Sequence, residues 1–214
     1  MATMTLNLQK AGDAPKPKLQ LSLNKEARFK IELEWDSEAD LDTHALLAFN
    51  DGNGAKVSAF EQILSTYNVK RPDNQGVLVA RNPDGSPNEQ GKGWFETPCG
   101  TLRHSGDSRR GDLTQIDEVI DFDGSRCPND RNEIPLFVLI HSPANATFAD
   151  VKSGLIRIKD QMDKEIGSYR LSDEFKAFKG IQLGSILRSA NGWEFAAAGT
   201  GFNGDFNTVL AHFS

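Results

Sequence analysis

Residues 29–35 alternate strictly between apolar and charged side chains. The segment reads Phe29-Lys30-Ile31-Glu32-Leu33-Glu34-Trp35. Successive side chains of a β-strand point to opposite faces of a sheet, so this alternation fits a strand with one face buried. The pattern therefore predicts a half-buried strand over these residues.

A continuous apolar run at residues 134–140 predicts a central strand, because strands covered on both faces read as unbroken apolar sequence. Pro135 is expected at the beginning of this strand, where a missing amide hydrogen does least harm. Shorter strands, separated by Gly, Asp, Asn and Lys turns, are expected over residues 41–49, 155–158, 165–171, 181–187 and 193–198. Many short strands at this spacing predict an all-β sandwich.

Helix is expected in two places only. Near the end of the chain the apolar residues at helical spacing are Phe206, Val209, Leu210 and Phe213. Asn203 or Asp205 could cap the start of this helix. A short helix is also expected near residues 147–151.

Residues 70–96 differ in composition from the rest of the chain. They contain the run Arg81-Asn82-Pro83-Asp84-Gly85-Ser86-Pro87-Asn88-Glu89-Gln90-Gly91, which is rich in turn formers. We expect an exposed hairpin or long loop here, inserted in a single domain that spans residues 1–214.

The bulk composition argues against several partners and compartments. With a net charge of −6 and a pI of about 5.3, nonspecific binding to nucleic acid or an anionic membrane is not favoured. No window approaches the ~18 apolar residues of a membrane span, and residues 1–5 lack the parts of a signal peptide. Cys99 and Cys127 could pair, but two free thiols in a reducing compartment are the expectation. These features predict a cytoplasmic protein, or one within an intracellularly assembled particle.

Two acidic clusters lie about sixty-five residues apart. The first is Trp35-Asp36-Ser37-Glu38-Ala39-Asp40-Leu41-Asp42, and the second runs from His104-Ser105-Gly106-Asp107 through Asp112 to Asp117-Glu118. Each places several carboxylates among small residues, with strand-like sequence nearby. A hard divalent cation such as Ca²⁺ takes six to eight oxygen ligands of this kind. If the clusters meet in space, the sequence predicts a calcium site.

Several ordered motifs resemble the tellurium-resistance TerD stress-protein family. They are Trp35-Asp36 with Asp40-Leu41-Asp42 and Ala45-Leu46-Leu47, His104-Ser105-Gly106-Asp107-Ser108-Arg109, Asp117-Glu118-Val119-Ile120, Phe137-Val138-Leu139-Ile140-His141, Ile156-Arg157-Ile158, Tyr169-Arg170-Leu171-Ser172, Asn191-Gly192-Trp193-Glu194-Phe195 and Gly199-Thr200-Gly201-Phe202. The resemblance covers nearly the whole chain apart from residues 70–96. It implies a calcium-binding β-sandwich of two packed sheets with short helices, and no established catalytic activity for the family as a whole.

The chain departs from the family pattern in the second acidic cluster. Where the family usually has an acidic, Gly-rich "EGDGDDE", this chain has Asp112-Leu113-Thr114-Gln115-Ile116-Asp117-Glu118. Two carboxylates and two glycines are thereby replaced. Glu38-Ala39 also stands where the family often has Asp-Phe. These departures put two full sites in question and leave open one site or a weakened affinity.

Spacing along a strand supports the first cluster as a metal site. Asp40 and Asp42 would point to one face, roughly 6.5–7 Å apart, and could converge on an ion at ~2.4 Å each. The expected metal ligands are Asp36, Asp40, Asp42, Asp107, Asp112, Asp117 and Glu118. Asp36 and Glu118 could instead hold turns through backbone hydrogen bonds. Carboxylates favour Ca²⁺ over Zn²⁺, and Mg²⁺ stays open although it demands a more regular octahedron.

The function expected from these residues is a calcium-binding, non-catalytic interaction or assembly module, whose partner is another protein or a second copy. The family resemblance suggests a role in stress or tellurite resistance. One alternative is a structural component of a large assembly such as a virus particle. A less favoured one is a metal-assisted hydrolase around Asp40, Asp42, His44 and Asp107. His44 is more typical of a strand surface or a satisfied core histidine, and His104 is expected to brace the Ser-Gly-Asp turn.

Overall fold

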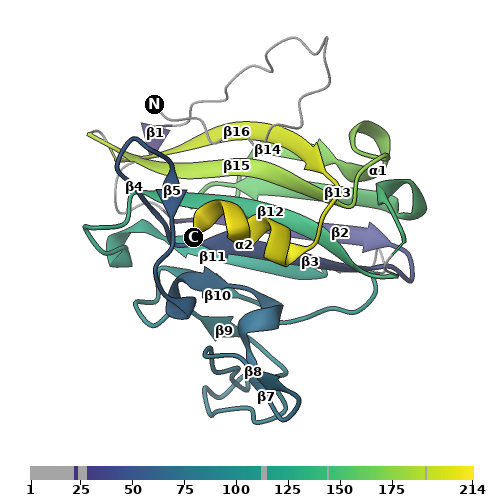
Figure 1. Ribbon diagram of the computed structural model, residues 1–214, viewed down its shortest axis with the longest axis horizontal. Coiled ribbons are helices and arrows are strands. Elements are labelled where there is room, and N and C mark those ends of the chain that lie inside the picture. Colours follow the sequence, from purple (N-terminus) through teal and green to yellow (C-terminus); the bar gives the residue numbers. More distant parts are fainter. Residues whose placement is uncertain (1–21, 24–27, 112–114, 144, 191) are drawn as a thin grey trace.

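Two antiparallel sheets of six strands each pack face to face (Figure 1). The computed structural model describes residues 22–23, 28–111, 115–143, 145–190 and 192–214. The first sheet has the order β1 (Ser22–Leu23), β16 (Gly192–Phe202), β15 (Gly180–Ser189), β12 (Glu133–Ser142), β3 (Asp40–Leu46) and β6 (Ile63–Leu64). The second has the order β14 (Glu165–Arg170), β13 (Lys152–Lys159), β2 (Arg28–Asp36), β11 (Glu118–Asp123), β10 (Leu102–His104) and β9 (Phe95–Glu96). The predicted all-β sandwich is confirmed.

Strand β2 has the buried face that its alternation predicts. The side chains turned into the sandwich core are Phe29, Ile31, Leu33 and Trp35. Glu32, on the opposite face, is also nearly buried, and its carboxylate lies 2.7 Å from the ammonium group of Lys159 on the neighbouring strand β13. A strand with charged residues on one face is thus stabilised by packing inside and by ion pairs outside.

Strand β12 is apolar on both faces because it contributes to two hydrophobic clusters. Leu136 and Val138 belong to the main core between the sheets, whereas Phe137 and Leu139 belong to a second cluster on the outer face of the first sheet. Pro135 is the third residue of β12 and pairs with Ser185 of β15, whereas the ladder of β12 with β3 begins only at Leu136. The central strand predicted for residues 134–140 is confirmed.

Helix α2 (Phe206–Phe213) covers this second cluster, and Figure 1 shows it lying across β12 and β3. Of the two possible caps it uses Asp205, whose carboxylate accepts a hydrogen bond of 2.9 Å from the amide of Thr208. The short helix expected near residues 147–151 is the 3₁₀ turn η4 (Phe148–Asp150). Helix α1 (Leu171–Glu174) and the 3₁₀ turns η1 (Phe60–Gln62), η2 (Thr66–Asn68) and η3 (Gly124–Arg126) were not expected.

Two predicted strands end earlier than expected. The strand placed at 41–49 ends at Leu46; beyond it Leu47 donates its amide to Gln62, and Ala48 forms an isolated bridge with Glu133. Residues Phe49–Asn50 form a separate strand β4 with β5 (Ala55–Lys56). The strand placed at 165–171 stops at Arg170, since the side chain of Leu171 turns into the core and begins α1.

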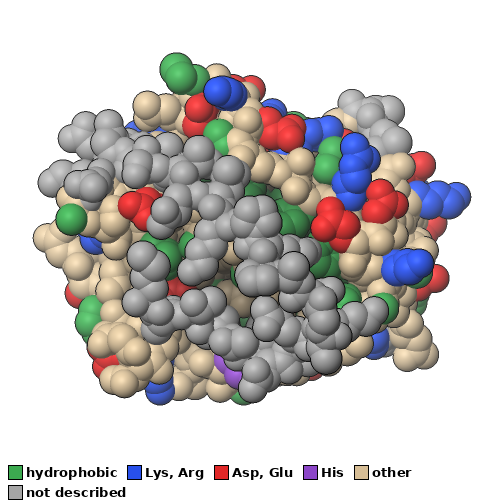
Figure 2. All heavy atoms as spheres, turned by 90° about the horizontal axis from the view of Figure 1, so that it is seen from above, with side chains coloured by type: hydrophobic (Ala, Val, Ile, Leu, Met, Phe, Trp, Pro, Cys, Tyr) green, Lys and Arg blue, Asp and Glu red, His purple; other side chains and the backbone are tan. Residues whose placement is uncertain are grey.

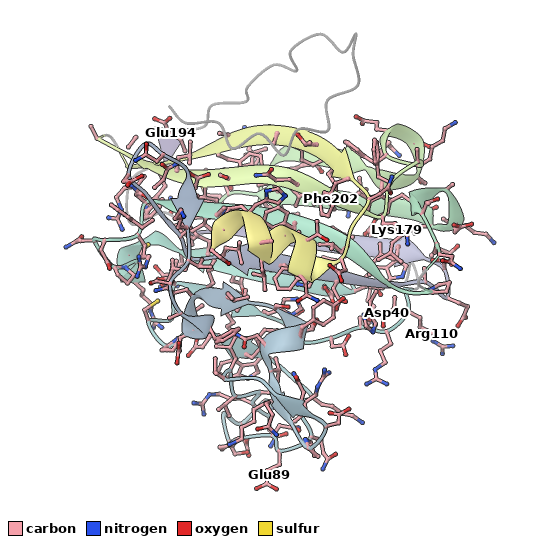
Figure 3. All side chains as sticks on the ribbon, viewed as in Figure 1. Asp40, Glu89, Arg110, Lys179, Glu194 and Phe202 are labelled. Atoms are coloured by element: carbon pink, nitrogen blue, oxygen red, sulfur yellow. The ribbon has the colours of Figure 1, made fainter. Side chains whose placement is uncertain are left out.

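Residues 70–94 project from the sandwich and are named the arm (Figure 1). The arm begins with a hairpin of β7 (Lys70–Arg71) and β8 (Asn74–Gln75), and residues 95–96 after it form β9. Glu89 marks its far end in Figure 3. The side chains of Leu78 and Ala80 are buried in the main core. The arm is therefore anchored to the sandwich and is not exposed along its whole length, as the expected hairpin or loop would be.

On the face seen in Figure 2, acidic and basic side chains are intermixed and not separated by sign. Within the described ranges, no helix is long and apolar enough to cross a membrane.

The packing of α2 on the first sheet predicts a matched pair of substitutions. Phe206→Ala should lower the free energy of unfolding by about 3 kcal/mol, because a buried ring is replaced by a cavity. Phe60→Ala should change it by less than about 0.5 kcal/mol, because that ring is 65% exposed. Urea denaturation monitored by circular dichroism measures both, and equal losses would contradict the assignment of Phe206 to the second cluster.

Candidate cation site

Strand β3 carries Asp40 and Asp42 on its outer face. Between them, Leu41 points into the main core, so the period of two places both carboxylates on the opposite side. Asp42 is buried and Asp40 is half-buried at the end of the strand. Figure 3 shows Asp40 on the side of the sandwich from which the arm projects.

The loop after β10 brings a third carboxylate to the same place. Gly106 has φ of +119°, which L-residues with a side chain rarely adopt, and the turn it makes presents Asp107. Ligand oxygens of Asp40, Asp42 and Asp107 all lie within 4.8 Å of one another. These three residues are the carboxylate triad. The two distant acidic segments therefore meet in space.

A buried network holds β3 against the second sheet beside the triad. Glu118 is fully buried, and its carboxylate accepts hydrogen bonds from the amide of Thr43 at 2.8 Å and from its hydroxyl at 2.9 Å. The other oxygen of Glu118 accepts from the amide of Ser108 at 3.3 Å. Thr43 belongs to the first sheet, whereas Glu118 begins β11 in the second. One carboxylate thus fixes both segments that carry the triad.

His104 completes this network. Its Nδ1 accepts the amide hydrogen of Gly106 at 3.0 Å, and Phe95 stacks on the ring. Because Nδ1 is an acceptor, Nε2 carries the hydrogen and donates to the hydroxyl of Thr43 at 2.8 Å. The neutral ring braces the turn that presents Asp107, the role that the sequence suggested for it.

Two hydroxyl groups hold Asp42 from the side of the 3₁₀ turn η2. Thr66 donates to Oδ1 and the phenol of Tyr67 donates to Oδ2, both at 2.7 Å. The Tyr67 oxygen also lies 3.0 Å from Nδ1 of His141. The position of Asp42 is therefore set by a turn outside both acidic clusters.

The triad concentrates negative charge in a partly desolvated place. Burial and the neighbouring Asp107 raise the pKa of Asp40 to about 6. Burial and the neighbouring Glu118 raise the pKa of Asp42 to about 7. Oδ1 of Asp40 is buried and has no hydrogen-bond partner among the described residues. Such an acceptor is costly unless a proton or a cation satisfies it.

Asp36, Asp117 and Glu118, which were also predicted as metal ligands, do not belong to the triad. Asp36 is exposed at the end of β2. Asp117 accepts the amide of Trp35 at 3.1 Å, and its own amide donates to Leu33. Glu118 holds backbone amides, which is the alternative considered for it from the sequence. Asp112 lies outside the described residues.

Thr43, Thr66, Tyr67 and His141 were missed by sequence reasoning. Thr66 and Tyr67 carry no spacing signal, because η2 reaches Asp42 only through tertiary packing. His44 lies on the same face of β3 as Asp42, but it is buried beneath α2 and stacks on Phe206 with ring centroids 4.2 Å apart. Neither of its ring nitrogens has a hydrogen-bond partner within the described part of the chain. His44 is therefore a core residue, but the expectation of a strand-surface or hydrogen-bonded core histidine is wrong. Burial holds its pKa well below the usual range.

The donor set suits a hard divalent cation. Three carboxylates supply oxygen only, and the orphaned oxygen of Asp40 gives an ion a ready ligand. The two hydroxyl groups on Asp42 fix its oxygens in the manner of the outer hydrogen bonds around metal ligands. Zn²⁺ would prefer imidazole or thiolate ligands, which the triad lacks. The residues therefore fit Ca²⁺, the ion that the family resemblance implies.

The fold and the site together define an antiparallel β-sandwich in which two distant segments bring three carboxylates together. The family model described as TerD domain matches residues 93–213 of this chain. The chain belongs to the TerD family, since this match covers more than half of its residues. Of the triad, Asp107 falls inside the matched region, whereas Asp40 and Asp42 precede it.

Individual relatives agree with this assignment. Tellurium resistance protein TerZ of Serratia marcescens is 35% identical over 109 residues, 50% of this chain and 55% of that protein, so the chain spans about half the length of TerZ. Tellurium resistance protein TerD of Alcaligenes sp is 24% identical over 219 residues, covering 98% of this chain and 97% of that protein. The crystal structure of a homologue of telluride resistance protein (TerD) from Streptomyces coelicolor A3(2) has a TM-score of 0.61 at 21% identity. It covers 86% of this chain and 95% of that one, and it supports the fold.

The raised pKa values predict a pH dependence for the ion-free protein. The folded triad keeps protons that the unfolded chain releases above about pH 4. The stability that these two groups contribute is therefore fully present below about pH 4 and is lost as pH rises through the pKa values of about 6 and about 7. Asp42→Asn removes one ionising group, so its stability relative to the wild type should rise between about pH 4 and about pH 7.

Urea denaturation of both proteins in a chelator, at several pH values, measures this difference. Taking the difference cancels the opposing contribution of the buried His44 ring, which is present in both. A stability difference that stays constant over the range would contradict the proposed crowding of the triad.

Proposed function

We propose that this chain binds Ca²⁺ at the carboxylate triad and acts as a non-catalytic interaction or assembly module, folded as one domain with the arm as an insertion. The observation that carries the proposal is the convergence of Asp40, Asp42 and Asp107 within 4.8 Å. Their positions are held by residues of both sheets and of η2, which gives the site a rigid frame.

The electrostatics of the triad support a cation as its ligand. Three carboxylates this close repel one another, and the guanidinium group of Arg109, which lies 3.7 Å from Asp107, is mostly exposed. An ion pair of that kind is screened by water and contributes little. A divalent cation would neutralise two charges and satisfy the orphaned oxygen of Asp40. Its binding would then stabilise the folded state.

Calcium is preferred to magnesium because the frame is irregular. The triad combines two strand residues with one loop residue, and Asp42 already accepts two hydroxyl hydrogens. Ca²⁺ tolerates variable numbers and angles of oxygen ligands, with water completing the shell, whereas Mg²⁺ demands a regular octahedron.

A role in stress or tellurite resistance is supported by the names of the relatives, several of which are tellurium-resistance or stress-response proteins. We propose that the chain acts by binding a partner and not by catalysis, because His44, the histidine on the same strand as Asp40 and Asp42, is buried beneath α2. The ion would fix the edge of the sandwich at which β3, the loop after β10 and the arm meet.

Calorimetric titration with Ca²⁺ tests the site. The wild type should bind with measurable heat, and Asp107→Asn should weaken binding by at least about tenfold because one ligand is lost. Asp36→Asn should bind like the wild type, since Asp36 lies outside the triad. Comparing Asp107→Asn with Asp36→Asn therefore tests whether only the triad, and not every acidic residue predicted from the sequence, binds the ion.

Thermal unfolding provides an independent readout. Ca²⁺ at one hundred times its dissociation constant should stabilise the wild type by about 2.7 kcal/mol, and EGTA should reverse the effect. A wild type that gives no heat, and that melts at one temperature in Ca²⁺ and in EGTA, would rule out the proposed site.

Sedimentation velocity distinguishes the proposed interaction module from the alternative, a structural component of a large assembly. A Ca²⁺-responsive monomer or small complex is the expected result. A ring or lattice that forms equally in EGTA would favour the structural role instead.

A further inference from the structure

The arm contacts the candidate cation site from two sides. Its first residues pack on η2, the turn that holds Asp42, and its last residues pack on the loop that presents Asp107. Each contact includes a glycine on which a Cβ would lie within 3.0 Å of the opposing backbone.

The first contact is centred on Asn74. Its side-chain amide donates hydrogen bonds to the carbonyls of Tyr67 at 2.7 Å and of Val69 at 2.8 Å. Gly76 lies directly on Asn68, where a Cβ would overlap the backbone. Tyr67 and its neighbour Thr66 are the residues whose hydroxyl groups hold both oxygens of Asp42. Asn74 therefore supports the partners of a triad carboxylate.

The second contact joins Gly93 to Gly106. A Cβ on Gly106 would lie 2.8 Å from the carbonyl oxygen of Gly93, so the two backbones touch. Gly106 directly precedes Asp107 and donates its amide to His104. Any displacement of the arm at Gly93 would remove the backbone against which this turn rests.

The two contacts are joined through the arm itself. Leu78 exchanges backbone hydrogen bonds with residues at the base, donating to Asn68 at 3.0 Å and accepting from Lys70 at 2.8 Å. Arg81 donates its amide to the carbonyl of Trp94 at 2.7 Å, which ties the middle of the arm to its last residues beside Gly93. Trp94 is covered by the guanidinium of Arg103, 3.8 Å from the ring centroid. The base of the arm is thus one connected unit.

We propose that the arm is a clamp for the cation site, that Asn74 is a positioning residue for Asp42, and that ion binding and arm docking stabilise each other. This inference rests on the proposed binding of Ca²⁺ at the triad. Coupling free energies are reciprocal: if the docked arm raises the affinity for the ion, the ion must stabilise the docked arm to the same extent.

A matched pair of arm variants tests the first half of the coupling. Asn74 and Asn82 are both half-buried, and the side-chain amide of each donates two hydrogen bonds. The bonds of Asn82 go to Ser86 and Pro87, which remain inside the arm. Asn74→Ala should weaken Ca²⁺ binding by about tenfold, and Asn82→Ala should leave it unchanged, by calorimetric titration.

Hydrogen exchange tests the reciprocal half without altering the arm. The amides of Lys70 and Leu78, bonded within the base, should exchange more slowly in Ca²⁺ than in EGTA. Asp107→Asn, which leaves the arm sequence intact, should abolish that difference. An arm that merely packs on the sandwich would exchange at the same rate with and without the ion.

The outcomes separate the clamp from the site. Suppose that the wild type binds Ca²⁺, that Asn74→Ala and Asn82→Ala bind it as tightly as the wild type, and that Ca²⁺ does not change hydrogen exchange in the arm. The proposed clamp is then wrong, whereas the proposed calcium site is retained. If the wild type binds no Ca²⁺, the proposed function fails and the clamp fails with it. Circular dichroism of Asn74→Ala confirms that a lost affinity does not reflect an unfolded chain.

Discussion

The buried carboxylate of Glu118 is the interaction on which the architecture of the site depends. It begins β11 in one sheet and accepts both the amide and the hydroxyl of Thr43 in the other, so it fixes the spacing of the two sheets at this edge. Its second oxygen reaches Ser108, next to Asp107. A buried carboxylate is tolerated only when such donors surround it. Without it, the two acidic segments would have no common frame.

That frame concentrates charge instead of dispersing it. Asp40 and Asp42 are placed by the period of a strand whose other face is needed for the core, and Asp107 is placed by a turn that requires glycine. The resulting raised pKa values of the two strand aspartates show that the arrangement opposes ionisation. Carboxyl groups whose pKa values are raised by burial and a neighbouring charge are candidates for a functional site. A bound cation would neutralise this charge, and the arm contacts both η2 and the turn at Gly106, so ion binding would affect it.

The sequence predicted most of the fold, because two-residue alternation at 29–35 and the apolar run at 134–140 are direct consequences of burial. It also predicted a calcium site on the condition that the two acidic clusters meet, and Asp40, Asp42 and Asp107 do meet. It did not separate the triad from Asp36 and Asp117, since spacing alone does not say which carboxylate a turn directs toward its own backbone. The sequence also did not predict that Thr66 and Tyr67 of η2 bind Asp42. These residues contact Asp42 only because the 3₁₀ turn packs on β3.

Diffraction from crystals grown with Ca²⁺ tests the central claim most directly, because anomalous scattering locates the ion independently of any affinity. The account predicts an anomalous peak among the carboxylates of Asp40, Asp42 and Asp107, with oxygens at about 2.4 Å from it. A map in which these three side chains surround no peak, or in which the ion lies elsewhere on the sandwich, would contradict it.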